Sequence, residues 1–205
     1  MDFDLGARST VGPVVLAIGL VLAACSGGSE RAESSQLDNS PLSFGFPALL
    51  PTQLTSATHG GDALDFSTEP MAVGDGVIYV ECDGSRLLLD IGPGSGFWAS
   101  YYHVHRVSFE DGSEVEMGTI LGQLARTSGD ALGCGGVWDN PHLHFEIYDF
   151  RPAENEWDGI PTTAYSLGGW AQDPDDTGRV GALEHQEFGR RQQWEFIAST
   201  DMPEG

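Results

Sequence analysis

The sequence predicts an all-β fold of short antiparallel strands joined by turns. The 205 residues include 28 glycines and 11 prolines, and few apolar stretches repeat with a helical period. Glycine and proline are typical of the turns that bound short strands. Because 40% of the residues are hydrophobic, the chain is able to bury a core of ordinary size, and its length predicts one domain with tails.

Two β-rich segments follow one another in residues 70–96. The stretch PMAVGDGVIYVECDGSRLLLDIGPGSG contains the dipeptides Asp75-Gly76 and Asp83-Gly84. An Asp-Gly step between such segments is typical of a tight turn. We therefore expect consecutive antiparallel strands in this part of the chain.

The next segment, FWASYYHVHRVSFEDG at residues 97–112, alternates strongly and ends at the Asp-Gly turn. This alternation predicts a single strand. Successive side chains of a strand point to opposite faces, so Tyr101, His103 and His105 are expected to share one face.

A pair of histidines lies in the apolar, β-prone stretch NPHLHFEIYDF at residues 140–150. In an extended strand His142 and His144 emerge on the same side, while Leu143 and Phe145 point the other way. Two imidazoles side by side suit a metal ligand next to a proton-transfer group. The pair alone is weak support for a metal site, so further partners are needed.

Further candidate ligands occur early in the chain, where THGGDALDFS contains His59, Asp62 and Asp65. Together with the two histidine-bearing strands, this segment supplies the ligands of a catalytic zinc ion, which commonly takes three ligands from histidine and carboxylate and leaves a fourth position to water. The water then has a pKa near neutrality, and free histidines nearby are suited to proton transfer.

The motifs HGGDALDF, YYHVH and PHLHFEI, in this order, resemble the lysostaphin-type (LytM-like) zinc endopeptidases, and especially their beta-lytic branch. The resemblance implies that His59, Asp65 and His144 bind zinc. It also implies that His103 and His142 stay unligated and act on the water and the transition state. The implied fold is a distorted sandwich of antiparallel sheets, of the duplicated hybrid motif type, with the metal in a groove between loops.

Some assignments have alternatives. Asp62 is a rival of Asp65 as a ligand, but the motif match favours Asp65, and the glycine before Asp62 is typical of a turn. We expect His105 to be a rim residue and His185 to lie on the surface. Glu146 shares the strand face of the histidine pair. It is expected to be a solvated carboxylate, a group that supports a metal ligand, or a catalytic carboxylate.

The amino-terminal run VGPVVLAIGLVLAAC reads as an export signal, and its last four residues look like a bacterial lipobox ending at Cys25. We expect a signal peptide at 1–24, a lipidated cysteine and flexible tether at 25–44, a zinc domain at 45–150, and an extension at 151–205 packed on the core. The protein would then be an extracytoplasmic, membrane-anchored lipoprotein; the alternative is a secreted protein.

The other two cysteines, Cys82 and Cys134, form an even count, so one disulfide is expected in an oxidising compartment, with two buried thiols as the alternative. Three tryptophans of the last third are expected either to contact a glycan or to anchor the extension: Trp157, Trp170 and Trp194.

The net charge of −22, with nine arginines and no lysine, argues against binding to nucleic acid or anionic lipid through a basic patch. The predicted function is that of a monomeric zinc endopeptidase, which hydrolyses peptide bonds in the cross-links or stem peptides of peptidoglycan. The alternative is a catalytically silent lipoprotein that binds the cell wall or activates amidases.

Overall fold

A computed structural model describes residues 42–59, 62–172 and 182–198, without the side chains of 56–59. The expected signal peptide, the lipidated cysteine and most of the tether lie outside the described residues. Within the described ranges, no helix is long and apolar enough to cross a membrane.

Strands make up nearly all of the regular structure, which confirms the predicted all-β, antiparallel fold. The described helical segments are α1 (Ser128–Ala131) and two 3-10 turns, Cys82–Gly84 and Thr162–Ala164. The strands are β1 (Leu42–Phe44), β2 (Thr52–His59), β3 (Ala63–Phe66), β4 (Gly76–Glu81), β5 (Arg86–Ile91), β6 (Phe97–Tyr102), β7 (Val104–His105), β8 (Ser113–Val115), β9 (Gln123–Leu124), β10 (Leu143–Tyr148), β11 (Tyr165–Leu167), β12 (Trp170–Gln172), β13 (Ala182–His185), β14 (Gly189–Gln192) and β15 (Phe196–Ile197).

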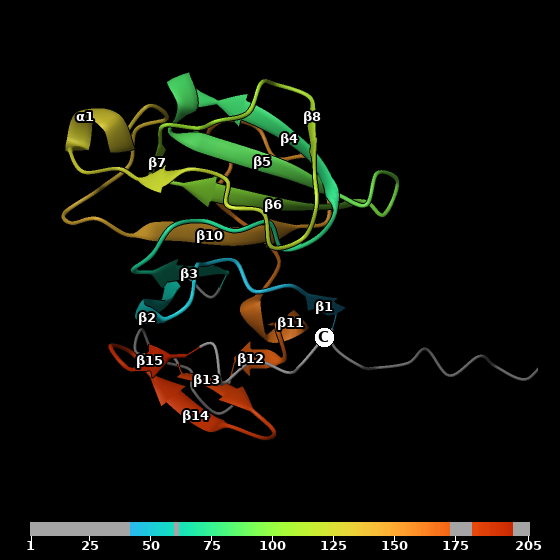
Figure 1. Cartoon of the computed structure of the whole chain (residues 1–205), viewed down its shortest axis with the longest axis vertical. Helices are drawn as coiled ribbons and strands as arrows, with labels where there is room; N and C mark the ends of the chain where they lie inside the picture. The colour runs from blue at the N-terminus through green and yellow to red at the C-terminus, as the bar shows by residue number, and fades with distance from the viewer. Residues whose placement is uncertain (1–41, 60–61, 173–181, 199–205) are drawn as a thin grey trace, which may run out of the picture. The chain divides into compact units, whose positions relative to one another are not determined.

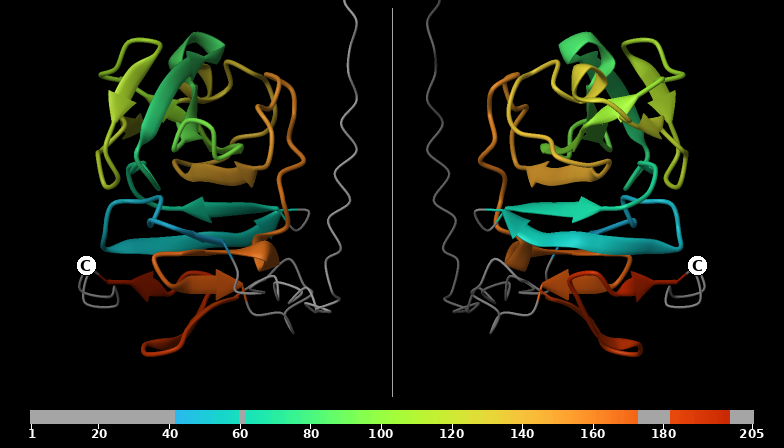
Figure 2. Two further views of the ribbon diagram at one scale, coloured as in Figure 1. Left: turned by 90° about the vertical axis from the view of Figure 1, so that its right-hand side faces the viewer. Right: turned by 90° about the vertical axis from the view of Figure 1, so that its left-hand side faces the viewer.

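The largest sheet has eight strands in the order β15-β2-β3-β10-β6-β5-β4-β8, and its strand pairs are antiparallel. A five-stranded sheet, β1-β11-β12-β13-β14, contains one parallel pair between its first two members, and β7 pairs with β9. The strands β12 to β14 lie on the far side of β2 and β3 from β10 (Figures 1 and 2).

The middle of the large sheet positions the predicted metal site. Strand β10 lies between β3 and β6, and His144 is opposite Asp65 on one side and Tyr102 on the other. The alternation LHFEIY places Leu143 and Phe145 in the core with no exposure, as the sequence predicted.

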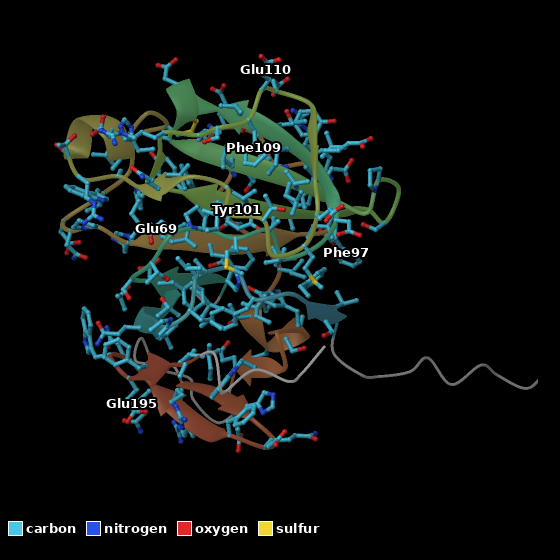
Figure 3. The ribbon with its side chains drawn as sticks, viewed as in Figure 1. Glu69, Phe97, Tyr101, Phe109, Glu110 and Glu195 are labelled. Carbon is cyan, nitrogen blue, oxygen red and sulfur yellow. A yellow bond between two sulfur atoms is a disulfide. The ribbon has the colours of Figure 1, made fainter. Side chains whose placement is uncertain are left out.

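The core beneath this site is aromatic as well as aliphatic. Tyr101, near the centre of the sheet in Figure 3, is fully buried, and its ring packs edge-on against Phe145 with 5.3 Å between centroids. The Tyr101 hydroxyl accepts a 2.9 Å hydrogen bond from the amide of Val73. The β6–β10 pair is therefore fixed by packing and by a satisfied polar group.

The expectation of one strand over residues 97–112 is wrong. Strand β6 ends at Tyr102, and His103 has a φ of 62°, in the left-handed region that breaks an extended strand. The chain turns there and resumes as β7. As a result Tyr101 points into the core, and His103 and His105 line two different pockets instead of sharing a face.

The hairpin predicted in residues 70–96 is present, because β4 and β5 pair antiparallel across the turn that contains Asp83. The first residue of this turn, Cys82, is bonded to Cys134 in a disulfide, as predicted. This bridge connects the hairpin to the loop that precedes β10.

The prediction that His185 lies on the surface is wrong. Its exposed fraction is 8%, and its ring packs on Trp170 and on Phe188, with centroids 5.3 and 4.6 Å away. The Nδ1 atom accepts a 3.1 Å hydrogen bond from the amide of Glu187. A histidine flanked by polar residues in the sequence is thus buried because its hairpin folds onto a tryptophan.

Candidate metal and catalytic site

Asp65 and His144 face each other across the β3–β10 pair. The Oδ1 atom of Asp65 lies 3.1 Å from Nδ1 of His144, and the Asp65 residue is only 4% exposed. The antiparallel register explains the contact, because these two residues are directly opposite each other. A motif near residue 65 and a motif near residue 144 therefore meet at one point.

A second carboxylate approaches the other nitrogen of His144. Its Nε2 atom lies 3.3 Å from Oε1 of Glu146, which is 1% exposed. The Tyr148 hydroxyl donates a hydrogen bond to Oε2 of the same carboxylate and lies 3.1 Å from the carbonyl oxygen of Glu156. The alternation of a strand places His144, Glu146 and Tyr148 on one face.

These two carboxylates determine the electrostatics of His144. Burial alone would lower the pKa of this imidazole, but the hydrogen bonds with Asp65 and Glu146 outweigh burial and raise the pKa to about 10. The position between the two acids thus stabilises positive charge.

The remaining two histidines of the motifs lie beside this pair. The ring centroid of His103 is 4.7 Å from that of His142 and 6.1 Å from that of His144. The Nε2 atom of His142 lies 3.9 Å from Oδ2 of Asp65. Four predicted site residues, three imidazoles and one carboxylate, are therefore in mutual reach.

Backbone carbonyls orient these two imidazoles. The Nδ1 atom of His103 is 3.0 Å from the carbonyl oxygen of Ala131, and that of His142 is 2.8 Å from the carbonyl oxygen of Asn140. A carbonyl only accepts, so each Nδ1 donates, and in a neutral ring Nε2 keeps its lone pair. Burial lowers the pKa of His103 to about 4, which keeps that ring neutral at pH 7.

All four side chains line one pocket with a cavity volume of about 540 Å³. Asp62, the rival ligand, lines the same pocket, and burial followed by the negative charge of Glu146 raises its pKa. The carboxylate in hydrogen-bond contact with His144 is Asp65. The pocket is lined by Thr55, Asp62, Asp65, Tyr102, His103, Gly136, Val137, Asp139, Asn140, His142, His144, Glu146, Trp157, Gln193 and Trp194.

The third predicted ligand, His59, has a described backbone, but its side chain lies outside the described residues. Its backbone pairs with Ala63 at the end of the β2–β3 hairpin, two residues before Asp65 on β3. Among the side chains that are described, no group of three or more His, Cys, Asp or Glu is arranged to hold a metal.

The described pair fits zinc chemically. Two ligand atoms of a tetrahedral zinc ion, each about 2.1 Å from the metal, are roughly 3.4 Å apart. The separation of 3.1 Å between Asp65 Oδ1 and His144 Nδ1 is close to this value. The second carboxylate on Nε2 of His144 is also the usual partner of a metal-binding imidazole.

His105 lies apart from this site. Its Nδ1 atom is 3.6 Å from Oδ1 of Asp130, and both side chains are more than a third exposed. It lines a second groove of about 630 Å³, together with Arg106 and Asp83. His105 is therefore a residue of a neighbouring surface, rather than a rim residue of the histidine pocket.

The model of peptidase family M23 matches residues 59–157, a range that includes all five predicted site residues. Residues 59–157 form a peptidase family M23 domain. The family indicated by the three motifs is thereby confirmed.

Two further comparisons place this M23 domain among known proteins. A segment of 63 residues is 35% identical to protease LasA of Pseudomonas aeruginosa, in strains UCBPP-PA14 and PAO1. It represents 31% of this chain but only 15% of LasA. The solved structure of pseudoalterin, described as an M23 metalloprotease from the deep sea, aligns with a TM-score of 0.61 at 19% identity, over 77% of this chain and 98% of that one, and shows a shared fold.

One residue of the M23 domain that sequence reasoning missed is Arg86. It has no exposure, and its guanidinium donates hydrogen bonds of 2.8, 3.0 and 3.2 Å to the carbonyl oxygens of Ala153, Glu154 and Glu156. It also lies 5.1 Å from the ring centroid of Trp157, which lines the pocket. Arg86 therefore holds the loop that forms one wall of the site.

Proposed function

We propose that this protein is a zinc-dependent endopeptidase that hydrolyses peptide bonds in peptidoglycan, with His59, Asp65 and His144 as the metal ligands. The observation that carries the proposal is the contact of Asp65 with His144 in a pocket that two further imidazoles share. Membership of a peptidase family supports the reaction class. The description of pseudoalterin as a metalloprotease agrees with a metal requirement.

When bound, zinc would lower the pKa of a water molecule and polarise the scissile carbonyl group. The chain's own contribution is proton transfer. We assign it to the Nε2 atoms of His103 and His142, because hydrogen bonds to backbone carbonyls fix each Nδ1 as a donor. When its ring is neutral, each Nε2 is able to accept a proton from the attacking water and to return it to the leaving amine.

Asp65 and Glu146 keep His144 in position from its two nitrogens. With Nε2–H donated to Glu146, the lone pair of Nδ1 points toward Asp65, the side on which a shared cation would lie. The pocket of about 540 Å³ has room for a short peptide segment.

We also propose the cellular setting and the organisation of the chain. The predicted signal at 1–24, the lipid on Cys25 and the tether at 25–44 would hold the domain outside the cytoplasm, where its substrate occurs. The disulfide between Cys82 and Cys134 supports an oxidising compartment. The domain at 45–150, the extension at 151–205 and the monomeric state belong to the same proposal.

The proposal is tested by measuring zinc content and the release of soluble fragments from dye-labelled peptidoglycan on the same preparations. We expect about one zinc ion per chain for the wild type, close to none for His144→Ala, and retained zinc without fragment release for His142→Ala. His105→Ala is the matched control, since this histidine lines the other groove. A wild type that binds no zinc and releases no fragments would favour a silent, wall-binding protein instead.

A further inference from the structure

The C-terminal extension contributes a tryptophan to the pocket of the M23 domain. Trp194 lies beyond residue 157, where the family match ends, yet it lines the same pocket as His103, His142 and His144. Its exposed fraction is 57%. An indole that stays in contact with water at the mouth of a pocket is available to a ligand.

The backbone of Trp194 is held in an unfavourable conformation. Its φ of 70° lies in the left-handed region, which costs a residue with a large side chain about 1–2 kcal/mol. Its amide donates a 2.7 Å hydrogen bond to the carbonyl oxygen of Leu54, and its own carbonyl accepts a 3.1 Å bond from Nε2 of Gln53. Both partners belong to β2, the strand beside β3.

The rest of this turn is equally constrained. Nε2 of Gln193 donates a 2.6 Å hydrogen bond to the carbonyl oxygen of Thr55, and Glu195 closes the turn through bonds with Gln192 in both directions. Figure 3 shows Glu195 beside β14 and β15, at the edge of the C-terminal strands. Strand β15 follows and pairs with β2. The indole is therefore presented from a rigid turn, which lowers the entropic cost of binding a ligand.

Anchoring the extension does not require Trp194. That role is filled by Trp170, which has no exposure and packs between His185 and the guanidinium of Arg191. Trp170 and Trp194 thus differ in environment, the first in the core and the second at the pocket.

The surroundings of Trp194 indicate the class of ligand. Two neighbours of Trp194 also line the pocket: Gln193, which precedes it in the sequence, and Thr55, which belongs to β2. Both side chains are polar and uncharged. Other parts of the pocket carry carboxylates, such as Asp62 and Asp139, and the whole chain has a net charge of −22. Such a site disfavours anionic groups. The Thr55 hydroxyl is buried, so the amide of Gln193 is the neighbouring polar group that a ligand can reach. An exposed indole face beside this amide suits the C–H face and hydroxyl groups of a neutral sugar ring.

We propose that Trp194 is a substrate-binding platform that stacks its indole against an N-acetylhexosamine ring of the peptidoglycan glycan strand, next to the peptide to be cut. The inference rests on the proposed function for the identity of the substrate. It assigns to the extension the recognition of the sugar, and to the M23 domain the cleavage of the peptide.

A binding experiment tests the platform without requiring cleavage. The N-acetylglucosamine–N-acetylmuramic acid disaccharide, with its lactyl carboxylate converted to the methylamide so that the probe is neutral, is titrated calorimetrically into His142→Ala and into the double variants that add Trp194→Gly, Trp194→Tyr or Phe196→Ala. Glycine relieves the strain at the left-handed φ, tyrosine keeps an aromatic face, and Phe196 is an exposed aromatic residue outside the pocket lining. We expect the variant with Trp194→Gly to bind the disaccharide about tenfold more weakly than His142→Ala alone. The variants with Trp194→Tyr and Phe196→Ala should bind it as His142→Ala does.

A kinetic experiment then compares a cross-linked peptide that carries the disaccharide with the same peptide stripped of sugar. Trp194→Gly is expected to raise KM about tenfold for the first substrate, with kcat retained, and to leave both constants unchanged for the second. An equal change on both substrates, or disaccharide binding that does not depend on Trp194, would overturn the platform. Wild-type protein that cuts neither substrate while Trp194-dependent binding persists would refute the peptidase function alone.

Discussion

The Nε2 atom of His144 lies 3.3 Å from Oε1 of Glu146, a carboxylate with 1% exposure two residues further along the same strand. A metal-binding imidazole usually donates its second N–H to such a carboxylate, which fixes the tautomer and increases the basicity of the ligating nitrogen. Glu146→Gln is therefore expected to weaken zinc binding about 10- to 100-fold.

Competition with a fluorescent zinc chelator measures this effect directly, without any measurement of catalysis. Tyr148→Phe removes one donor to Glu146 and is expected to weaken zinc binding less. Glu114→Gln, an exposed change on β8, is the matched control. Equal zinc affinities of Glu146→Gln and the wild type would show that Glu146 does not support the ligand.

The choice between two aspartates gives the second prediction. Asp65→Ala is expected to reduce zinc content from about one per chain to nearly none, because its carboxylate is in contact with His144. Asp62→Ala is expected to keep zinc, since Asp62 lines the pocket but the carboxylate in hydrogen-bond contact with that imidazole is Asp65. Metal analysis by mass spectrometry on both variants decides the assignment, and the reverse pattern would make Asp62 the ligand.

The features of this site that depend on local pattern could be predicted from the sequence. The extended pattern of residues 140–150 predicted His142 and His144 on one side, and both lie near Asp65. The partnership with Asp65 came only from resemblance to a family, because the register between strands almost eighty residues apart is not written in either strand.

The features that were predicted wrongly or missed depend on distant parts of the chain. A left-handed φ at His103 is stable only where surrounding groups hold it, here the carbonyl of Ala131 on the ring. Arg86 gave no sequence signal, since its carbonyl partners lie 67 to 70 residues away. His185 was predicted to lie on the surface. It is buried because its hairpin packs on Trp170, and the local sequence gives no sign of this packing.

The lowered pKa of His103 predicts a pH dependence of stability in zinc-free protein. Burial lowers this pKa from 6.5 to about 4, so between these values the unfolded chain binds more protons than the folded one. The contribution of the neutral His103 ring to the free energy of unfolding is fully present above pH 6.5 and is lost as the pH falls toward 4. The expected loss in the free energy of unfolding is about 3 kcal/mol at most.

Urea unfolding at several pH values, in the presence of a chelator, measures this loss. His103→Asn is a suitable comparison, because asparagine tolerates a left-handed φ and its amide is able to donate to the carbonyl of Ala131. Stability of this variant should fall less steeply between pH 6.5 and 4. Parallel curves would mean that other groups cause the acid sensitivity.

Arg86 connects the buried core with the loop that forms one wall of the pocket, so its replacement is expected to affect both. Arg86→Met keeps the buried volume but leaves the carbonyls of Ala153 and Glu154 without their donor and removes one of two donors near the carbonyl of Glu156, at a cost of about 3 kcal/mol in stability. Faster hydrogen exchange in residues 153–157 is expected as well, because the loop to Trp157 loses its attachment. Arg126→Met, an exposed change in another loop, should alter neither quantity. Unchanged exchange in Arg86→Met would show that Arg86 does not hold the loop.

The disulfide between Cys82 and Cys134 leads to a prediction that joins stability to the site. It closes a loop with a sequence separation of 52, for which loss of the cross-link is expected to cost about 4 kcal/mol in the free energy of unfolding. The bridge also precedes Gly135, whose carbonyl accepts a 2.6 Å hydrogen bond from the Tyr102 hydroxyl, and the Tyr102 ring lies 4.2 Å from that of His103. Reductant should therefore lower both the unfolding midpoint and the peptidase activity of the wild type. The double variant Cys82→Ser, Cys134→Ser should not respond to reductant. An equal response of the two proteins would mean that reductant acts elsewhere in the chain.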